Sequence, residues 1–373
     1  QVLGFLKGAG NLKEVEQRRK NDLTGVFFIL SGVPFDDSGG GARGAQIAQE
    51  LLRKDWGVVF LHKFERNETK DLQLRNRHPN LFLSPIDRFS LEEFVGQHPD
   101  LLKKNPINVL IEFPLPDFLP LVKRLREEYG AAVAYDLLDD WETSLGGKWY
   151  TPDVEEQIIQ VSTHLVSTLP GLAARLETKS GQKSLILPNA VNTRLFDPCL
   201  AYPRPQDLPA GQRILVYVGA LWGEWFDWDL LGYLADAHPD VQIALIGDYR
   251  GQAPFQKGNV HFLGLKAQKE IPAYLAHADA ALLPWKATAI TQATSPLKIY
   301  EYLAMRLPVV TPSLEPLRDM PGVFPCDSWE EFSRLAGSVA RQQLDEEVLA
   351  AFIQRNNWSN RVEELLGHLD RIQ

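Results

Sequence analysis

The feature that most constrains the fold is an alternation of short apolar runs with helical stretches, interrupted once near the middle of the chain. Each run is rich in β-branched and aromatic residues, and a polar or glycine turn and a helical pattern follow it, which is typical of parallel β-α units. The runs are 25–30, 58–61, 80–83, 108–111, 131–135, 164–167 and 184–187, then 214–218, 242–246, 260–263, 280–283, 307–311 and 322–325. We therefore predict an α/β protein with two parallel sheets.

The interruption begins with Leu187-Pro188-Asn189-Ala190-Val191-Asn192 and continues through a proline-rich stretch that includes Tyr202-Pro203-Arg204-Pro205 and Pro209. Such a stiff, turn-prone segment is a suitable interdomain linker. The last helical stretch, about 344–369, is too long for one simple helix and contains Asn356-Asn357-Trp358-Ser359-Asn360, so we expect a break there. We predict a first domain over residues 1–198, a second over 199–352 and a terminal helix over 353–373.

Composition excludes several classes of protein. The chain has 373 residues, is 45% hydrophobic and 23% charged, and carries a formal net charge of -9. These values fit a globular enzyme and argue against a nucleic-acid-binding protein held by general electrostatics. Only Cys199 and Cys326 occur, without metal-site spacing, which favours a reducing, cytoplasmic setting. No apolar run approaches the roughly 20 residues of a membrane span. Gln1 is not a natural start, so we expect sequence outside this window.

The stretch Ser295-Pro296-Leu297-Lys298 starts a helix in a way that suits an anion. Serine is a good N-cap and proline fits the first turn, so we predict that the helix begins at about Ser295. Lys298 then lies in the first turn, where the helix dipole is already positive and a negative partner such as a phosphate is needed. The alternative is an i, i+3 pair of Lys298 with Glu301 on a solvated face.

A glycine-rich loop follows the first predicted strand. It contains Gly39, Gly40 and Gly41, followed by Arg43 at the start of a helix. Consecutive glycines let a backbone approach a ligand closely, although a turn that merely needs glycine is the alternative. The spacing overlaps a dinucleotide fingerprint, but the next strand ends in Leu61-His62-Lys63 instead of an acidic residue, which disfavours a nicotinamide cofactor.

Acidic residues follow the fifth predicted strand, where Asp139 and Asp140 precede Trp141. Either carboxylate could be a general base for an acceptor hydroxyl, or both could bind sugar hydroxyls beside a stacking wall formed by Trp141. A metal-holding pair is a third possibility, but no other ligand is evident. Helix capping is the structural alternative.

Loops after strands of the second half add further candidates. Gly219 opens an aromatic-rich loop suited to a domain interface or a ligand, whereas Gly247 and Leu265 lie in loops that could meet a base or a ribose.

Two stretches together resemble the GT-B glycosyltransferases, and most closely their retaining family four. Residues 187–196, Leu-Pro-Asn-Ala-Val-Asn-Thr-Arg-Leu-Phe, are similar to the family's "PNGVD...F" link between domains. Residues 295–304, Ser-Pro-Leu-Lys-Ile-Tyr-Glu-Tyr-Leu-Ala, followed by Pro308-Val309-Val310, are similar to its "P-x-K-x-x-E-Y-L-A-x-G-x-P-V-V" helix. The resemblance covers nearly the whole chain and implies two Rossmann-like domains facing across a cleft, with a terminal helix that crosses back to the first domain.

The resemblance also implies roles for the candidate residues. Glu301 would hydrogen-bond the ribose of a nucleotide sugar, and Lys298 with backbone amides in the segment Ser295, Pro296 and Leu297 would meet its diphosphate. Gly39, Gly40 and Gly41 would close over the donor from the first domain.

The chain departs from the family pattern in three respects. The usual glutamate eight residues before the ribose-binding one falls on Ala293, the expected Arg/Lys pair is absent near Ala220 and Glu224, and Arg306 replaces a glycine. A retaining reaction, and an inverting one with Asp139 or Asp140 as base, therefore both stay open.

The implied function is transfer of a sugar from a uridine or guanosine diphosphate sugar to a saccharide or lipid-linked acceptor, in envelope polysaccharide or glycan synthesis. The nucleotide sugar is a substrate, and the resemblance implies no cofactor and no metal ion. A cytoplasmic enzyme with peripheral contact to the inner membrane face would fit. The alternatives are a catalytically inactive module of the same fold and a sugar-nucleotide epimerase.

Overall fold

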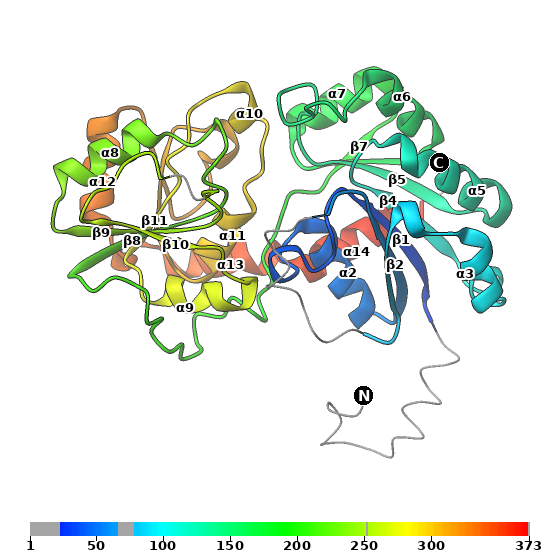
Figure 1. Cartoon of the computed structure of the whole chain (residues 1–373), viewed down its shortest axis with the longest axis horizontal. Coiled ribbons are helices and arrows are strands. Elements are labelled where there is room, and N and C mark those ends of the chain that lie inside the picture. The colour runs from blue at the N-terminus through cyan, green and yellow to red at the C-terminus, as the bar shows by residue number, and fades with distance from the viewer. Residues whose placement is uncertain (1–22, 66–77, 251–252, 372–373) are drawn as a thin grey trace, which may run out of the picture.

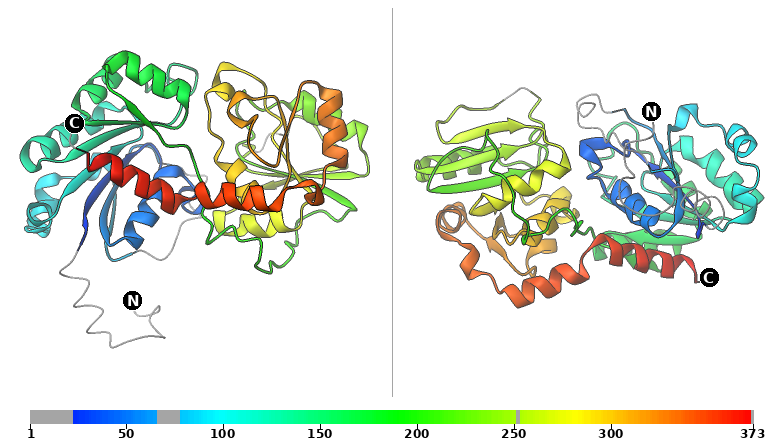
Figure 2. Two further views of the ribbon diagram at one scale, coloured as in Figure 1. Left: turned by 180° about the vertical axis from the view of Figure 1, so that it is seen from behind. Right: turned by 90° about the horizontal axis from the view of Figure 1, so that it is seen from below.

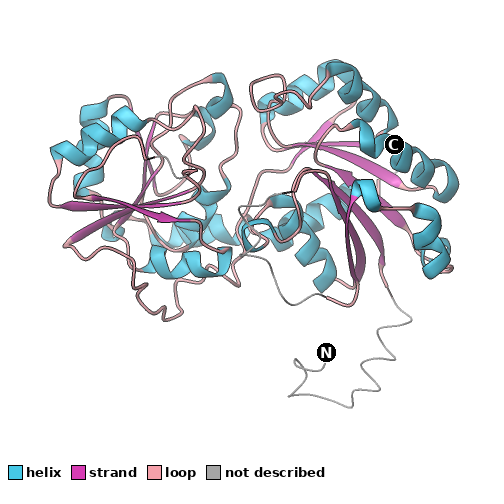
Figure 3. Cartoon of the chain, viewed as in Figure 1, coloured by secondary structure: helices cyan, strands magenta, loops and turns pink. Residues whose placement is uncertain are grey.

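The structure is a computed structural model that describes residues 23–65, 78–250 and 253–371. It has two α/β domains that lie side by side, and the chain passes between them near the middle of the molecule (Figure 1). In each domain the strands lie between layers of helices (Figure 3).

The described part of the first domain contains a seven-stranded parallel sheet. In spatial order the strands are β3 (Leu81–Pro85), β2 (Trp56–His62), β1 (Gly25–Ser31), β4 (Ile107–Ile111), β5 (Ala132–Leu137), β6 (His164–Ser167) and β7 (Ser184–Ile186). The order reverses between β1 and β4, the place at which open α/β sheets bind ligands beyond their carboxyl ends.

Helices cover both faces of this sheet, because successive side chains of a strand point to opposite faces. Val26, Phe28 and Leu30 of β1 belong to one apolar core, and Phe27 and Ile29 belong to the other. The helices are α2 (Arg43–Arg53), α3 (Leu91–Gln97), α4 (Leu101–Lys104), α5 (Leu119–Tyr129), α6 (Pro152–Val161) and α7 (Pro170–Ser180), with 3-10 turns η1 (Asp37–Gly39), η3 (Ile86–Arg88) and η4 (Pro116–Phe118).

The second domain has a six-stranded parallel sheet within the described residues. Its spatial order is β10 (Val260–Gly264), β9 (Val241–Ile246), β8 (Arg213–Val218), β11 (Ala280–Leu282), β12 (Val309–Pro312) and β13 (Val323–Cys326). Its helices and turns are α8 (Trp228–Ala237), η5 (Gln268–Glu270), α9 (Ile271–Ala276), α10 (Ala289–Gln292), α11 (Leu297–Ala304), η6 (Glu315–Leu317), α12 (Trp329–Ser338), η7 (Arg341–Gln343) and α13 (Glu346–Arg355). Each predicted strand forms within two residues of its expected bounds, so the prediction of two parallel sheets is confirmed.

The chain crosses between the domains twice, and the two crossings are hydrogen-bonded together. Val191 N donates to Asn356 O at 3.1 Å, and Trp358 N donates to Val191 O at 3.2 Å. The predicted break in the terminal helix is confirmed, because α13 ends at Arg355 and α14 (Trp358–Leu369) begins after it. Figure 2 shows α14 crossing back to the first domain, where it packs against α2 and β5.

Arg43, the first residue of α2, holds the first crossing to the first domain. Its Nε and Nη2 donate to the carboxylate of buried Asp136 at 2.8 and 3.1 Å. The same guanidinium donates to Leu187 O at 3.0 Å, to Pro188 O at 3.3 Å and to Asn189 Oδ1 at 3.1 Å. One buried cation therefore joins a helix start, the end of β5 and the interdomain linker.

Replacing Arg43 with methionine should destabilise the protein strongly, because it leaves the Asp136 carboxylate buried without its cation. We expect Arg43→Met to lower the free energy of unfolding by about 3–5 kcal/mol, measured by urea denaturation. Arg53→Met is the matched control on the same helix. The Arg53 side chain is 38% exposed and pairs with Glu50 at 2.7 Å, so its loss should cost about 1 kcal/mol or less. Equal losses for the two variants would contradict the role of Arg43.

Candidate active site

The two domains meet at loops that follow strands of both sheets. Ser144, after β5, donates its hydroxyl to Glu224 Oε1, after β8, at 2.6 Å. Asn189 Nδ2 of the linker donates to Ser295 O, just before α11, at 2.7 Å. The carboxyl-terminal edges of the two sheets therefore face each other, and most of the predicted site residues lie there.

Helix α11 begins two residues later than predicted. Pro296 occupies the N-cap position with an extended backbone, and no side chain caps the helix. The prediction that Ser295 is the N-cap is therefore wrong. Ser295 lies outside the helix and its carbonyl is used by Asn189, so this segment is positioned by a partner more than a hundred residues away in sequence.

Glu301 is a buried carboxylate on α11. Its side chain is 1% exposed, and Lys298 Nζ lies 3.2 Å from its Oε2 while 28% of the lysine side chain is exposed. The i, i+3 pair that we considered as an alternative is thus present, but the carboxylate is buried and does not lie on a solvated face. Oε1 accepts a hydrogen bond from Gln268 Nε2 at 3.2 Å, whereas Oε2 accepts none with proper geometry from the described residues. This oxygen can still accept a hydroxyl.

The glycine loop lies directly against the second domain. Gly39 has a φ of 78°, and a Cβ placed on it would lie 3.0 Å from Gln268 N and 3.3 Å from Ala267 Cβ. Gly40 also has a positive φ, and Gly41 lies over the Gln268 side chain. A side chain at Gly39 would push the domains apart, so glycine is needed here for close approach as well as for backbone conformation. The Arg43 side chain does not take part in this contact. Its guanidinium is buried against Asp136 and the linker.

The adjacent residues Asp139 and Asp140 have different environments. Asp140 forms an ion pair with Arg175 and accepts a hydrogen bond from Glu142 N at 3.2 Å. The Asp139 carboxylate instead faces the second domain, with Thr294 Oγ1 at 3.4 Å from its Oδ1. Burial raises the pKa of Asp139 to about 7, against the opposing hydrogen bond from Thr294. Asp139 is therefore a carboxyl group that can exchange a proton near neutral pH.

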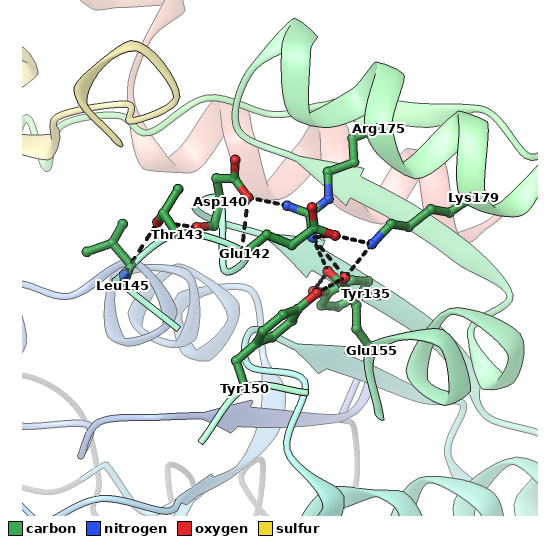
Figure 4. A network of polar contacts seen from close by, with 9 residues as sticks. All are labelled: Tyr135, Asp140, Glu142, Thr143, Leu145, Tyr150, Glu155, Arg175 and Lys179. Carbon is green, nitrogen blue, oxygen red and sulfur yellow. Dashed lines mark hydrogen bonds and ion pairs between the residues drawn. The ribbon is translucent and has the colours of Figure 1, made fainter. Parts of the chain in front are cut away.

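An ionic network around buried Glu155 holds the loop after β5, to which Asp140 belongs (Figure 4). Glu155 accepts hydrogen bonds from the hydroxyls of Tyr135 and Tyr150, each at 2.8 Å, and pairs with Arg175 and Lys179 at 2.8 and 2.9 Å. Burial alone would raise the pKa of Glu155, but Lys179, Arg175 and the two tyrosines outweigh it and lower the pKa. Since Arg175 also binds Asp140, the network fixes the start and the end of the loop.

Aromatic rings lie in loops after β2, β4 and β5, in the same part of the first domain. Trp141 and Trp149 have ring centroids 5.1 Å apart, Phe113 lies 4.9 and 5.5 Å from them, and Phe64 lies 6.3 Å from Trp149. The Trp141 indole N–H is buried and has no hydrogen-bond partner among the described residues. Aromatic faces and an indole donor of this kind can bind a sugar ring and its hydroxyl.

Sequence reasoning missed Glu112, which lies directly after β4 at the point where the strand order reverses. Its carboxylate is buried beside the first turn of α2, where a Cβ on Gly44 would lie 2.5 Å from its Oε2. Burial and the charge of Asp136 raise its pKa to about 7, against a hydrogen bond with Ser31 and the charge of Arg43. The available signal was a lone glutamate between the apolar residues Ile111 and Phe113.

The other predicted residues lie in loops of the second domain. Gly219 and Gly247 follow β8 and β9, and they pack so closely that a Cβ on Gly247 would lie 1.7 Å from Gly219 O. Leu265 follows β10 and is half-buried. In the same group of loops, Arg250 stacks on exposed Trp222 at 4.1 Å from the ring centroid.

Within the described ranges, no group of three or more His, Cys, Asp or Glu side chains could hold a metal ion. A search of the same residues found no helix with the length and apolar character of a membrane span.

Comparison with known proteins finds similarity in the second domain. Residues 212–328 match the family described as glycosyl transferases group 1. The relatives of the chain are distant. It is 25% identical over 201 residues to TuaH of Bacillus subtilis (strain 168), which is named as a teichuronic acid biosynthesis glycosyltransferase, and the match covers 49% of this chain. The chain thus spans about half the length (50%) of that relative.

Solved structures of glycosyltransferases share the fold. HepE of Anabaena, in complex with UDP and glucose, is 14% identical with a TM-score of 0.62, and the match covers 93% of this chain and 100% of HepE. A glycosyltransferase of Rickettsia africae ESF-5 is 12% identical with a TM-score of 0.64, covering 92% and 98%. WaaG, a glycosyltransferase of lipopolysaccharide biosynthesis, is 15% identical with a TM-score of 0.54, covering 92% and 96%. The predicted GT-B fold is confirmed.

The raised pKa of Glu112 predicts how stability depends on pH. The unfolded carboxyl titrates near pH 4.5 and the folded one near pH 7, so between these values the folded protein holds more protons. The contribution of the Glu112 carboxyl to the free energy of unfolding is fully present below about pH 4.5 and is lost as the pH rises to 7. We expect Glu112→Gln to gain on the order of 1–3 kcal/mol over wild type between pH 5 and pH 8, measured by urea denaturation.

Glu128→Gln is a control of opposite sign. Arg124 lowers the pKa of exposed Glu128, so that its stabilising contribution is present above pH 4.5 and lost in acid. The free energy of unfolding of Glu128→Gln should be lower than that of wild type at neutral pH, and this difference should become smaller in acid. A Glu112→Gln profile parallel to wild type would show that Glu112 is not a buried neutral acid.

Proposed function

We propose that this protein transfers a sugar from a uridine diphosphate sugar to a saccharide or lipid-linked acceptor in cell-envelope polysaccharide synthesis. The observation that carries the proposal is the buried Glu301 carboxylate, which has Lys298 beside it and one oxygen that accepts no hydrogen bond. The UDP bound to HepE supports the choice of nucleotide, and the teichuronic acid name of TuaH supports a polysaccharide product.

The donor half of the site would act through charge. In our proposal the ribose hydroxyls donate to Glu301, and Lys298 with the N–H groups of the first turn of α11 faces the diphosphate. The leaving nucleoside diphosphate gains negative charge as its bond to the anomeric carbon breaks, and fixed donors at that position stabilise the transition state. Gly39 and its neighbours allow the first domain to close over the donor without a steric clash.

The acceptor half would use Asp139 as general base. Asp139 faces Thr294 of the second domain, whereas Asp140 is committed to Arg175. Asp139 would take the proton of an acceptor hydroxyl, whose oxygen attacks the anomeric carbon as the bond to the phosphate oxygen breaks. A carboxylate with a pKa near 7 is well matched to this task. This single displacement inverts the anomeric configuration, and the rings of Trp141 and Trp149 would bind the acceptor sugar.

Glu301→Gln and Lys298→Met test the donor site. We expect the dissociation constant for UDP, measured by calorimetry, to rise about 10- to 100-fold in each variant, since hydrogen bonds to charged groups contribute about 1.5–3 kcal/mol. Glu346→Gln is the control, because Glu346 pairs with Arg306 with 65% of its side chain exposed. Unchanged UDP affinity in both test variants would remove the basis of the proposal.

Asp139→Asn tests the catalytic base. Loss of the proton acceptor should lower kcat about 10²- to 10⁴-fold while UDP affinity stays at the wild-type value. In wild type, kcat should increase as pH rises through about 7, because only the ionised carboxylate accepts a proton. The anomer of the product, determined by NMR, should be opposite to that of the donor. A retained configuration would rule out this role of Asp139, and a changed donor sugar without acceptor would indicate an epimerase.

A further inference from the structure

Two buried glutamines connect the domains at the candidate donor site. Gln46 of α2 is 1% exposed and Gln268 of η5 is 5% exposed. Gln46 Nε2 donates to Gln268 Oε1 at 3.0 Å and to Gly40 O at 2.6 Å. Gln268 Nε2 donates in turn to Glu301 Oε1 at 3.2 Å. A continuous chain of hydrogen bonds therefore runs from the glycine loop to Glu301.

The charge of Glu301 sets the direction of this chain. An ionised carboxylate only accepts hydrogen bonds, so Gln268 must turn its amide nitrogen toward Glu301. The amide oxygen of Gln268 then faces Gln46, which must present its own nitrogen. That nitrogen has a second hydrogen, which Gly40 O accepts. Reversing either amide would place two donors or two acceptors against each other inside a buried region, which is costly.

The same contacts close the site. The glycine loop lies on Gln268, because a Cβ on Gly39 would lie 3.0 Å from the Gln268 backbone nitrogen and a Cβ on Gly41 would lie 3.5 Å from the Gln268 side chain. Glu301 is 1% exposed beneath them. A ribose can therefore reach the carboxylate only after the loop and Gln268 have separated.

We propose that Gln46 and Gln268 are positioning residues that latch the glycine loop to the donor carboxylate. The latch rests on the proposed function, because it gives Glu301 the role of ribose ligand. It opens to admit the nucleotide and forms again over it, since Glu301 Oε2 stays available to a hydroxyl while Oε1 keeps its bond to Gln268. Weakening the latch should therefore speed both entry and exit of the nucleotide and change the equilibrium little.

Gln46→Met tests the latch with a side chain of similar length that forms no comparable hydrogen bond. We expect the association and dissociation rate constants of UDP, measured by stopped-flow tryptophan fluorescence, each to rise about three- to tenfold, as loss of one buried hydrogen bond predicts. The dissociation constant should change less than about twofold. In a Gln268→Ala background the same substitution should have no further effect on the rates, because its partner is already missing.

Gln49→Met is the matched control. Gln49 lies on the same helix and also donates to Gly40 O, at 3.2 Å, but no hydrogen bond joins it to Gln268 among the described residues. Its UDP rate constants should match wild type. Equal rates for Gln46→Met and wild type, or equal acceleration in both variants, would overturn the latch.

A second measurement needs no ligand. Amide hydrogen exchange of the second-domain segment 262–272 should be about three- to tenfold faster in Gln46→Met than in wild type or Gln49→Met, because the latch is closed in the unliganded protein. Unchanged exchange would overturn the latch whether or not UDP binds. Failure of wild type to bind UDP, with exchange changed as expected, would instead overturn the proposed donor.

Discussion

The arrangement of the two domains depends on the buried guanidinium of Arg43. Burying a cation is costly unless charge and hydrogen bonds compensate, and here one carboxylate and three linker oxygens do so. Arg361 of α14 donates to the same Pro188 O at 3.0 Å, so the second crossing is held at the same place. The linker then continues to Asn189, which holds the segment before α11. The loops of the proposed donor and acceptor sites are thus positioned from one buried point.

Carboxylates that are buried or half-buried differ in what surrounds them, and their contacts distinguish a structural role from a chemical one. Glu155 has two tyrosines and two cations, which satisfy it and lower its pKa, so it supports a loop. Asp139 has one weak contact to Thr294 and a pKa near 7, which suits proton transfer. Glu301 differs from both in its contacts, because one oxygen accepts a hydrogen bond from Gln268 and the other, 3.2 Å from Lys298 Nζ, can accept a ligand hydroxyl.

Features that depend on local periodicity could be predicted from the sequence. Both sheets and the break before Trp358 follow from the spacing of apolar residues and from polar residues that interrupt a helix. Features that depend on distant partners could not. Ser295 is of a residue type that is common at the N-cap, but Asn189 holds it outside the helix. Arg43 follows three glycines, but its side chain turns toward Asp136. No sequence pattern identifies Gln46 and Gln268, because they come into contact only when the two domains pack together.

The contacts at the domain interface suit alanine at position 293, where the family that the chain resembles usually has a glutamate. Ala293 is partly buried and packs against the apolar core of the first domain. A glutamate there would place a charge against apolar side chains, which is unfavourable without a cationic partner. The first domain instead presents Asp139 toward Thr294, the residue after Ala293. The negative charge near this point of the interface therefore comes from Asp139 of the first domain, which in the proposed reaction acts on the acceptor hydroxyl.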